Sequence, residues 1–148
     1  MATYTAIAYH IVFSTKDRRP VLTEDRREEL FHYIWGVLKN RNSHLYRIGG
    51  VADHVHILTS LHPTIPLAEL VKDIKTGSAR WIKHDQVFRN FTNWQEGYGA
   101  FTCSARDIPS VIEYIKHQPE HHKKTTFADE YRRLLKEAGI EFEEKYLV

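Results

Sequence analysis

Residues 49–59 read GGVADHVHILT, and the alternation of apolar and polar residues in this stretch is typical of a β-strand. Side chains on a strand alternate between the two faces of the sheet, so His54 and His56 share one face. Val55 and Ile57 point to the other face, toward a core. Two imidazoles on one rigid face form half of a divalent-metal site. With ten histidines in 148 residues, chance alone supplies about two thirds of one His-x-His, so other residues must complete the argument.

The segments around this strand predict an α+β fold. We expect strands at residues 4–14, 45–48, 50–59 and 98–104. We expect helices at 23–39, 67–84 and 127–138, and one that starts at Asp107 or Ser110 and ends near Gln118. Gly49-Gly50 is interpreted as the tight turn of a hairpin. The order of elements is that of a ferredoxin-like (RRM-like) antiparallel sheet with helices on one face. The other face would be free to carry His54 and His56.

Composition limits the classes of protein that remain. A length of 148 residues with 42% hydrophobic and 27% charged residues predicts one globular domain spanning residues 1–148. The single cysteine, Cys103, excludes an intramolecular disulfide framework and fits a reducing cytoplasm. No signal peptide and no apolar run of about 20 residues is seen, so we expect a cytoplasmic protein without a membrane partner. A net charge of +2 gives no overall signal for a polyanion.

Tyr114 and Gln118 are a second candidate pair. They are four residues apart in the expected helix 107–118, so their side chains lie on one helix face. Taken alone, the pair is an ordinary boundary tyrosine and a polar neighbour at the end of an amphipathic helix.

Taken together, the two pairs resemble the single-tyrosine HUH transposases of IS200/IS605-type insertion sequences. The resemblance covers residues 4–135 and rests on YHIVFSTK (9–16), GGVADHVHIL (49–58), WQEGYGAF (94–101) and YIKHQ (114–118). Its specificity lies in order and separation, with His-x-His on a central strand and Tyr-x-x-x-Gln on a helix about sixty residues later.

The resemblance implies that His54, His56 and Gln118 ligate Mg²⁺ or Mn²⁺, and that Tyr114 lies on an additional C-terminal catalytic helix as the nucleophile. Tyr114 would attack single-stranded DNA at hairpin-bearing element ends and form a 5′-phosphotyrosine. A free tyrosine has a pKa near 10 and needs activation, which a Lewis-acidic ion on the phosphate would assist. The resemblance also implies a homodimer in which the tyrosine helix of one chain docks on the histidine strand of the other.

Basic residues suggest where DNA could bind. Lys72, Lys75, Arg80 and Lys83 share much of one helix side, and Arg18 and Arg19 lie in a turn after the first strand. Trp81 is near enough to this helix side to stack on a base. The alternative for these residues is a solvated surface, with Trp81 in the core.

The remaining histidines have structural interpretations. His10 is expected to be packed or hydrogen-bonded, and His117 to be a solvated helix residue or an extra ligand. His121-His122 is interpreted as a polar loop, because adjacent residues rarely chelate one ion.

Three other functions are compatible with parts of the pattern. Rolling-circle initiators and relaxases use the same chemistry but usually in longer chains. A domesticated relative acting on repeated palindromes would share the site. A non-catalytic nucleic-acid-binding module on a ferredoxin-like sheet would carry exposed aromatic residues on the sheet face, where this chain has two histidines.

Overall fold

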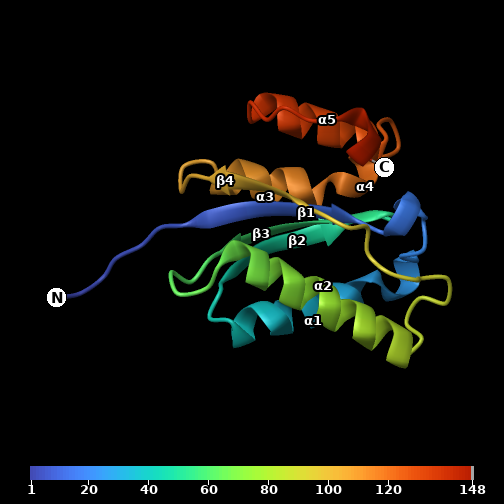
Figure 1. Cartoon of the computed structure of the whole chain (residues 1–148), viewed down its shortest axis with the longest axis horizontal. Coiled ribbons are helices and arrows are strands. Elements are labelled where there is room, and N and C mark those ends of the chain that lie inside the picture. The colour runs from blue at the N-terminus through green and yellow to red at the C-terminus, as the bar shows by residue number, and fades with distance from the viewer. Residues whose placement is uncertain (148) are drawn as a thin grey trace.

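A four-stranded antiparallel sheet forms the centre of the computed structural model, which describes residues 1–147 (Figure 1). The strand order is β2-β3-β1-β4, which is the expected ferredoxin-like topology. The strands are β1 (Ala8–Ser14), β2 (Leu45–Gly50), β3 (His54–Ser60) and β4 (Gly99–Cys103). The helices are α1 (Arg27–Asn40), α2 (Leu67–His84), α3 (Ile108–Lys116), α4 (Gln118–His121) and α5 (Phe127–Glu137), with short 3₁₀ turns at Lys16–Arg18, Glu24–Arg26 and Glu144–Tyr146.

One face of the sheet carries the main core under α1 and α2. Val55 and Ile57 of β3 are fully buried there, beside Ile11 and Phe13 of β1. β1 pairs with β3 so that Ile11 is opposite Ile57 and Phe13 is opposite Val55. The alternation predicted for β3 is therefore confirmed.

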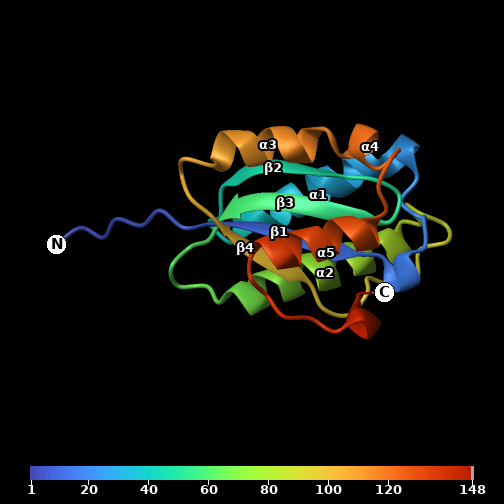
Figure 2. The same cartoon turned by 90° about the horizontal axis from the view of Figure 1, so that it is seen from above.

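The other face is covered as well, which corrects the expectation of a free face. α3 lies along β2, and α5 lies above β1 and β4 (Figure 2). A second apolar cluster explains the cover, because Leu58 of β3 and Cys103 of β4 pack against Ile115 of α3. His54 and His56 lie beneath these helices and are fully buried.

The two glycines before β3 are strand residues, not the turn of the hairpin. Gly49 pairs with His56 and Gly50 with Val55, so the connection falls at residues 51–53. A Cβ on Gly49 would lie 2.9 Å from both the Cγ2 and the carbonyl oxygen of Ile115. A glycine is needed there because α3 approaches the backbone of β2 this closely.

Several element boundaries differ from the sequence expectation. The first strand begins at Ala8, not Tyr4, and the expected helix 107–118 is interrupted at His117. Pro119 does not end that helix, since it falls in the first turn of α4. Across residues 1–147, no helix is long and apolar enough to cross a membrane.

Candidate active site

His54 and His56 point their Nε2 atoms into the space under α4 and α5. The Nδ1 of His54 donates to Asp53 Oδ1 at 2.7 Å, and the Nδ1 of His56 lies 2.8 Å from the Nε2 of His10. Both rings are thereby fixed from behind, and the carboxylate on His54 is the usual partner of a metal-ligating histidine. The prediction that His10 is packed and hydrogen-bonded is confirmed.

α3 and α4 bring the predicted tyrosine and glutamine to these histidines. The side chain of Tyr114 lies edge-on to His56, with ring centroids 5.7 Å apart. Gln118 is fully buried, and its Oε1 lies 3.2 Å from the Nε2 of His54. All four residues of the predicted site therefore meet within one chain.

Glu130 of α5 is the residue that the sequence interpretation missed. Its Oε1 lies 3.0 Å from His56 Nε2, 3.3 Å from His54 Nε2 and 3.1 Å from His122 Nε2. Its Oε2 accepts a 2.9 Å hydrogen bond from Gln118 Nε2 and one from the Tyr114 hydroxyl. Glu130 is fully buried, on the same helix face as Phe127. The signal available in the sequence was the spacing: Glu130 is three residues after Phe127, so it lies on the apolar face of the expected helix 127–138.

His122 also belongs to this cluster, which corrects its interpretation as a polar loop residue. Its side chain is only 9% exposed, and its Nδ1 donates to the carbonyl oxygen of Thr125 at 2.7 Å. The chain reverses between α4 and α5, so only one of the two adjacent histidines turns fully inward. The Nε2 of His121 lies 3.5 Å from Glu130 Oε2 and makes no hydrogen bond within residues 1–147.

Burial and hydrogen bonding set the charges of the cluster. Burial acts to raise the pKa of Glu130, but hydrogen bonds from His122, His54 and His56 hold it far below its usual range. Burial lowers the pKa of His56 to about 4. Burial also acts to lower the pKa of His54, but its hydrogen bonds to Asp53 and Glu130 raise it overall.

Tyr114 is held as a neutral phenol in this arrangement. Burial and the hydrogen bond to Glu130 raise its pKa, so the hydroxyl keeps its proton and donates to the carboxylate. Arg133 of α5 donates to the same oxygen from its Nη2 at 2.8 Å, and its charge acts in the opposite direction. A hydroxyl that contacts both a carboxylate and a guanidinium is oriented on two sides.

The cluster fits a divalent metal ion. One ligand atom from each of His54, His56, His122 and Glu130 lies within 4.8 Å of all the others. Imidazole and carboxylate together suit Mn²⁺ and Zn²⁺, while Mg²⁺ prefers oxygen ligands. Gln118 adds an amide oxygen at the edge of the same group.

The predicted DNA contacts fall into two regions. α2 lies on the opposite side of the sheet from the site (Figure 1). Its residues Lys72, Arg80 and Lys83 are exposed, and they belong to that opposite layer. Lys75 donates from Nζ to the carbonyl oxygens of Gln95 at 2.7 Å and Gly97 at 2.8 Å, which fixes the loop before β4. Trp81 stacks on Tyr33 of α1, with ring centroids 4.8 Å apart.

Arg18 and Arg19 lie on the side of the site. The loop that carries them is tied to the residue before His54, because the Thr15 backbone nitrogen donates to Asp53 O at 2.9 Å. Thr15 Oγ1 also donates to the carbonyl oxygen of Arg19 at 2.7 Å. Lys123 and Lys124, which follow His122 directly, are exposed and were not singled out from the sequence.

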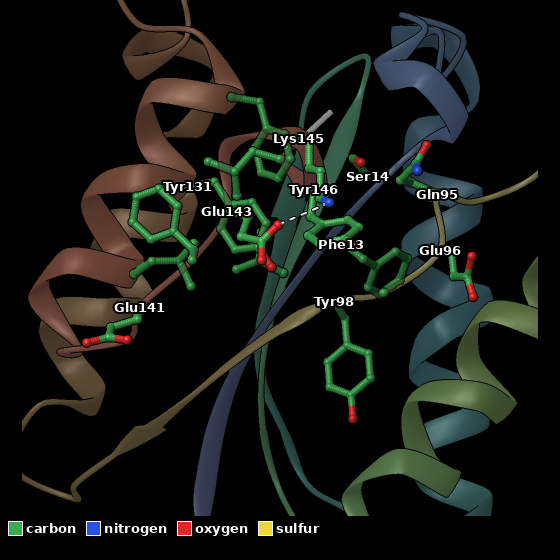
Figure 3. A pocket seen from close by; sticks show the side chains of 16 residues that line it. Phe13, Ser14, Gln95, Glu96, Tyr98, Tyr131, Glu141, Glu143, Lys145 and Tyr146 are labelled. Carbon is green, nitrogen blue, oxygen red and sulfur yellow. Dashed lines mark ion pairs between the residues drawn. The ribbon is translucent and has the colours of Figure 1, made fainter.

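A cleft of about 900 Å³ opens beside the cluster, between α5 with the C-terminal segment and the loop of residues 95–98 (Figure 3). Tyr98, Tyr131 and Tyr146 line it together with carboxylates, one of which, Glu143, pairs with Lys145 at 3.2 Å. Phe127 also lines it and stacks on His54, with ring centroids 4.3 Å apart. The ring of Phe127 therefore contacts both the cleft and His54.

Comparisons with known proteins agree on one group. A family model described as "Transposase IS200 like" matches residues 3–118. The transposase for insertion sequence element IS200 of Salmonella typhimurium is 26% identical over 121 residues, 78% of each chain. The ISDra2 transposase TnpA of Deinococcus radiodurans is 24% identical over 117 residues, 76% of this chain and 84% of that protein.

Two solved structures share the fold. One is of a protein from Deinococcus radiodurans R1 described as a transposase, with a TM-score of 0.61 and 22% identity, covering 80% of this chain and 95% of that one. The other is a REP-associated tyrosine transposase bound to a REP hairpin, with a TM-score of 0.60 and 18% identity, covering 82% of this chain and 74% of that one.

Proposed function

Because the chain belongs to the IS200-like transposase family, we propose that it cleaves and rejoins single-stranded DNA through a covalent bond to Tyr114. One observation carries the proposal. Tyr114 and the His54/His56 pair, sixty residues apart in sequence, meet around one buried carboxylate. A purely structural tyrosine at a helix end would not need this arrangement.

In the first step, the phenolic oxygen of Tyr114 attacks the phosphorus of a phosphodiester. The new Tyr114 O–P bond forms as the P–O3′ bond breaks. The phenolic proton passes by way of Glu130 Oε2, its hydrogen-bond partner, to solvent, and a water molecule donates a proton to the departing 3′ oxygen. The 5′ end stays on Tyr114 as a phosphotyrosine. Attack by a 3′-hydroxyl from another strand reverses these changes, so joining needs no nucleotide cofactor.

The residues around Tyr114 have defined tasks in this step. Arg133 contacts the hydroxyl and can stabilise the negative charge that develops on its oxygen. His54, His56 and Gln118 would hold Mg²⁺ or Mn²⁺, with Asp53 and His10 fixing the two rings from behind. A bound divalent ion supplies Lewis-acid stabilisation of charge on the scissile phosphate.

We propose that DNA reaches the site along the layer that carries α3, α4 and α5. Phosphates would be contacted by Arg18 and Arg19, in the loop tied to Asp53, and by Lys123 and Lys124, which follow His122. The cleft of Figure 3 is lined by aromatic rings and carboxylates, which suits bases better than phosphates. Lys72, Arg80 and Lys83 would then contact only DNA that extends to the opposite layer.

We also propose that each chain carries a complete site. Tyr114, His54 and His56 meet in a single polypeptide, so a homodimer is not required to bring them together. The shared site implied by the resemblance would require two chains to exchange the segment that begins at α3. With DNA as substrate, we expect activity in the cytoplasm on hairpin-bearing element ends, as the hairpin in the REP-associated relative suggests.

The test uses the whole chain and single-stranded oligonucleotides that cover the DNA on either side of its gene. Each oligonucleotide carries different dyes at its 5′ and 3′ ends and is incubated with Mn²⁺ or Mg²⁺. We expect a protein–DNA adduct that survives denaturation and carries only the 3′-end dye, because the 5′ phosphate of the downstream fragment is bound to Tyr114.

Tyr114→Phe is expected to abolish the adduct, while the matched variant Tyr4→Phe, at an exposed tyrosine outside the cleft, keeps it. His56→Ala is expected to reduce it at least a hundredfold. An adduct that persists in Tyr114→Phe would exclude Tyr114 as the nucleophile. Binding of the same oligonucleotides without any adduct would favour the non-catalytic module.

A further inference from the structure

We propose that Glu130 is a ligand of the divalent ion together with His54, His56 and His122, and that its second oxygen holds the Tyr114 hydroxyl beside that ion. The inference rests on the proposed function, because it concerns the same reaction. It adds two residues that lie beyond the segment matched by the family model, which ends at residue 118.

The hydrogen atoms on the imidazoles give the first argument. His122 donates from Nδ1 to a carbonyl oxygen, and His54 donates from Nδ1 to the carboxylate of Asp53. A neutral imidazole has only one N–H, so a ring that donates from Nδ1 offers the lone pair of its Nε2 to a metal ion. The Nε2 atoms of His122 and His54 face Glu130 Oε1, at 3.1 Å and 3.3 Å. Without an ion, protons on these nitrogens join them to the carboxylate, and a divalent ion can replace these protons and bind all of the atoms at once.

The spacing of the atoms gives the second argument. Ligands about 2.1 Å from one ion lie about 3.0–3.4 Å from their neighbours in tetrahedral or octahedral shells. The three distances from Glu130 Oε1 to imidazole nitrogens, 3.0, 3.1 and 3.3 Å, are of this length. Glu130 Oε1 therefore lies at the distance from the three imidazole nitrogens that is expected for ligands of one ion.

The other carboxylate oxygen provides the link to the nucleophile. Glu130 Oε2 accepts hydrogen bonds from the Tyr114 hydroxyl and from Gln118 Nε2. Gln118 thus orients the carboxylate through its Nε2, while its Oε1 faces His54 Nε2. One carboxylate then contacts the ion through Oε1 and the attacking residue through Oε2. α5 thereby sets the position of Tyr114 relative to the ion.

The experiment measures Mn²⁺ binding to the metal-free whole chain by titration calorimetry at pH 7.5, without DNA. Glu130→Gln keeps the shape of the side chain and is expected to weaken Mn²⁺ binding at least tenfold. Asp129→Asn changes the neighbouring exposed carboxylate on the same helix and is expected to leave affinity unchanged. Electron spin-echo spectra of bound Mn²⁺ give a second readout, in which His122→Asn lowers the number of coupled imidazoles from three to two.

The outcomes separate this inference from the proposed function. If His56→Ala binds Mn²⁺ as tightly as the parent chain, the metal half of the proposed function is wrong. If His56→Ala loses binding while Glu130→Gln keeps it within twofold, only the present inference is overturned. Should Glu130→Gln fail to fold, as judged by circular dichroism, His122→Asn decides: three imidazoles coupled in that variant would exclude His122 and overturn the proposed ligand set.

Discussion

The orientation of each side chain in the candidate site depends on neighbouring residues that hold it in place. His54 and His56 could be identified from their spacing, but Asp53 and His10, which fix their rings, have no spacing rule that marks them. Arg133 is similar, because only the packing of α5 brings its guanidinium to the Tyr114 hydroxyl. Variants of these residues are therefore tests that only the structure suggests.

Arg133→Met is expected to slow adduct formation about tenfold and leave Mn²⁺ affinity unchanged. The guanidinium stabilises charge on the phenolic oxygen through a charge-assisted hydrogen bond, and its partial exposure to solvent limits the effect. The rate is measured in single turnover with saturating DNA. Arg132→Met is the control, because Arg132 pairs with Glu144 and Asp129. Equal rates for Arg133→Met and the parent chain would exclude this role.

The metal-free chain is expected to lose stability as the pH falls from 6.5 toward 4. Burial lowers the pKa of His10 to about 3 and of His56 to about 4, from 6.5 in the unfolded chain. Between these values the unfolded chain binds protons that the folded chain does not, so acid favours unfolding. The raised pKa of His54 has the opposite sign but acts above pH 6.5, where the folded chain holds a proton that the unfolded chain releases.

His10→Gln is expected to reduce this pH dependence by up to about 1.4 kcal/mol per pH unit, measured by urea denaturation in EDTA at several pH values. His84→Gln is the matched control, because His84 is 87% exposed. The same pH dependence in His10→Gln as in the parent chain would contradict the assignment of the effect to His10.

At the scale of elements, the sequence predicted what depends on local pattern and missed what depends on contact. α2 runs from Leu67 to His84 as expected, because Pro66 precedes it and its apolar stripe is regular. The predicted end of β2 was wrong: the strand continues through Gly49 and Gly50, which have the composition of a turn. Only the close approach of Ile115 shows why glycine is used inside a strand. Likewise, nothing in the residues between α4 and α5 indicated that the chain would turn His122 inward.

Gly49→Ala is expected to destabilise the fold by about 1–3 kcal/mol and to reduce adduct formation. The added Cβ would meet the backbone oxygen of Ile115, which cannot move without α3, and Ile115 adjoins Tyr114. Gly36→Ala in α1 is the control, since nothing lies within 4 Å of its Cβ and a helical alanine should stabilise by about 0.5–1 kcal/mol. Equal free energies of unfolding for Gly49→Ala and the parent chain, from urea denaturation, would show that α3 can shift freely.

In the whole molecule, two layers of helices lie on opposite faces of the sheet. α1 and α2 cover the apolar face and pack on the main core, while α3, α4 and α5 cover the histidine face and carry Tyr114, Gln118 and Glu130 (Figures 1 and 2). The topology of the sheet was predictable because it follows from the order of elements. The closing of the second face was not, because it depends on how a short helix pair and α5 fold back over β1 and β4.

This closing of the second face leads to a prediction about subunits. If each chain completes its own site, a mixture of Tyr114→Phe and His56→Ala chains should form no adduct, even after joint unfolding and refolding to allow exchange. Each mixed dimer would contain one site without its nucleophile and one without a ligand. Parent chains treated in the same way serve as the control for recovery of activity.

Restored cleavage in the mixture would instead mean that the segment from α3 onward passes to the partner chain. In that case Ile115 of one chain would pack over Gly49 of the other, in the same close contact. Gly49→Ala placed in the His56→Ala chain would then leave restoration intact, because the working site uses the sheet of the other chain. Placed in the Tyr114→Phe chain, it would reduce restoration. The glycine thus reports which sheet lies beneath the working tyrosine.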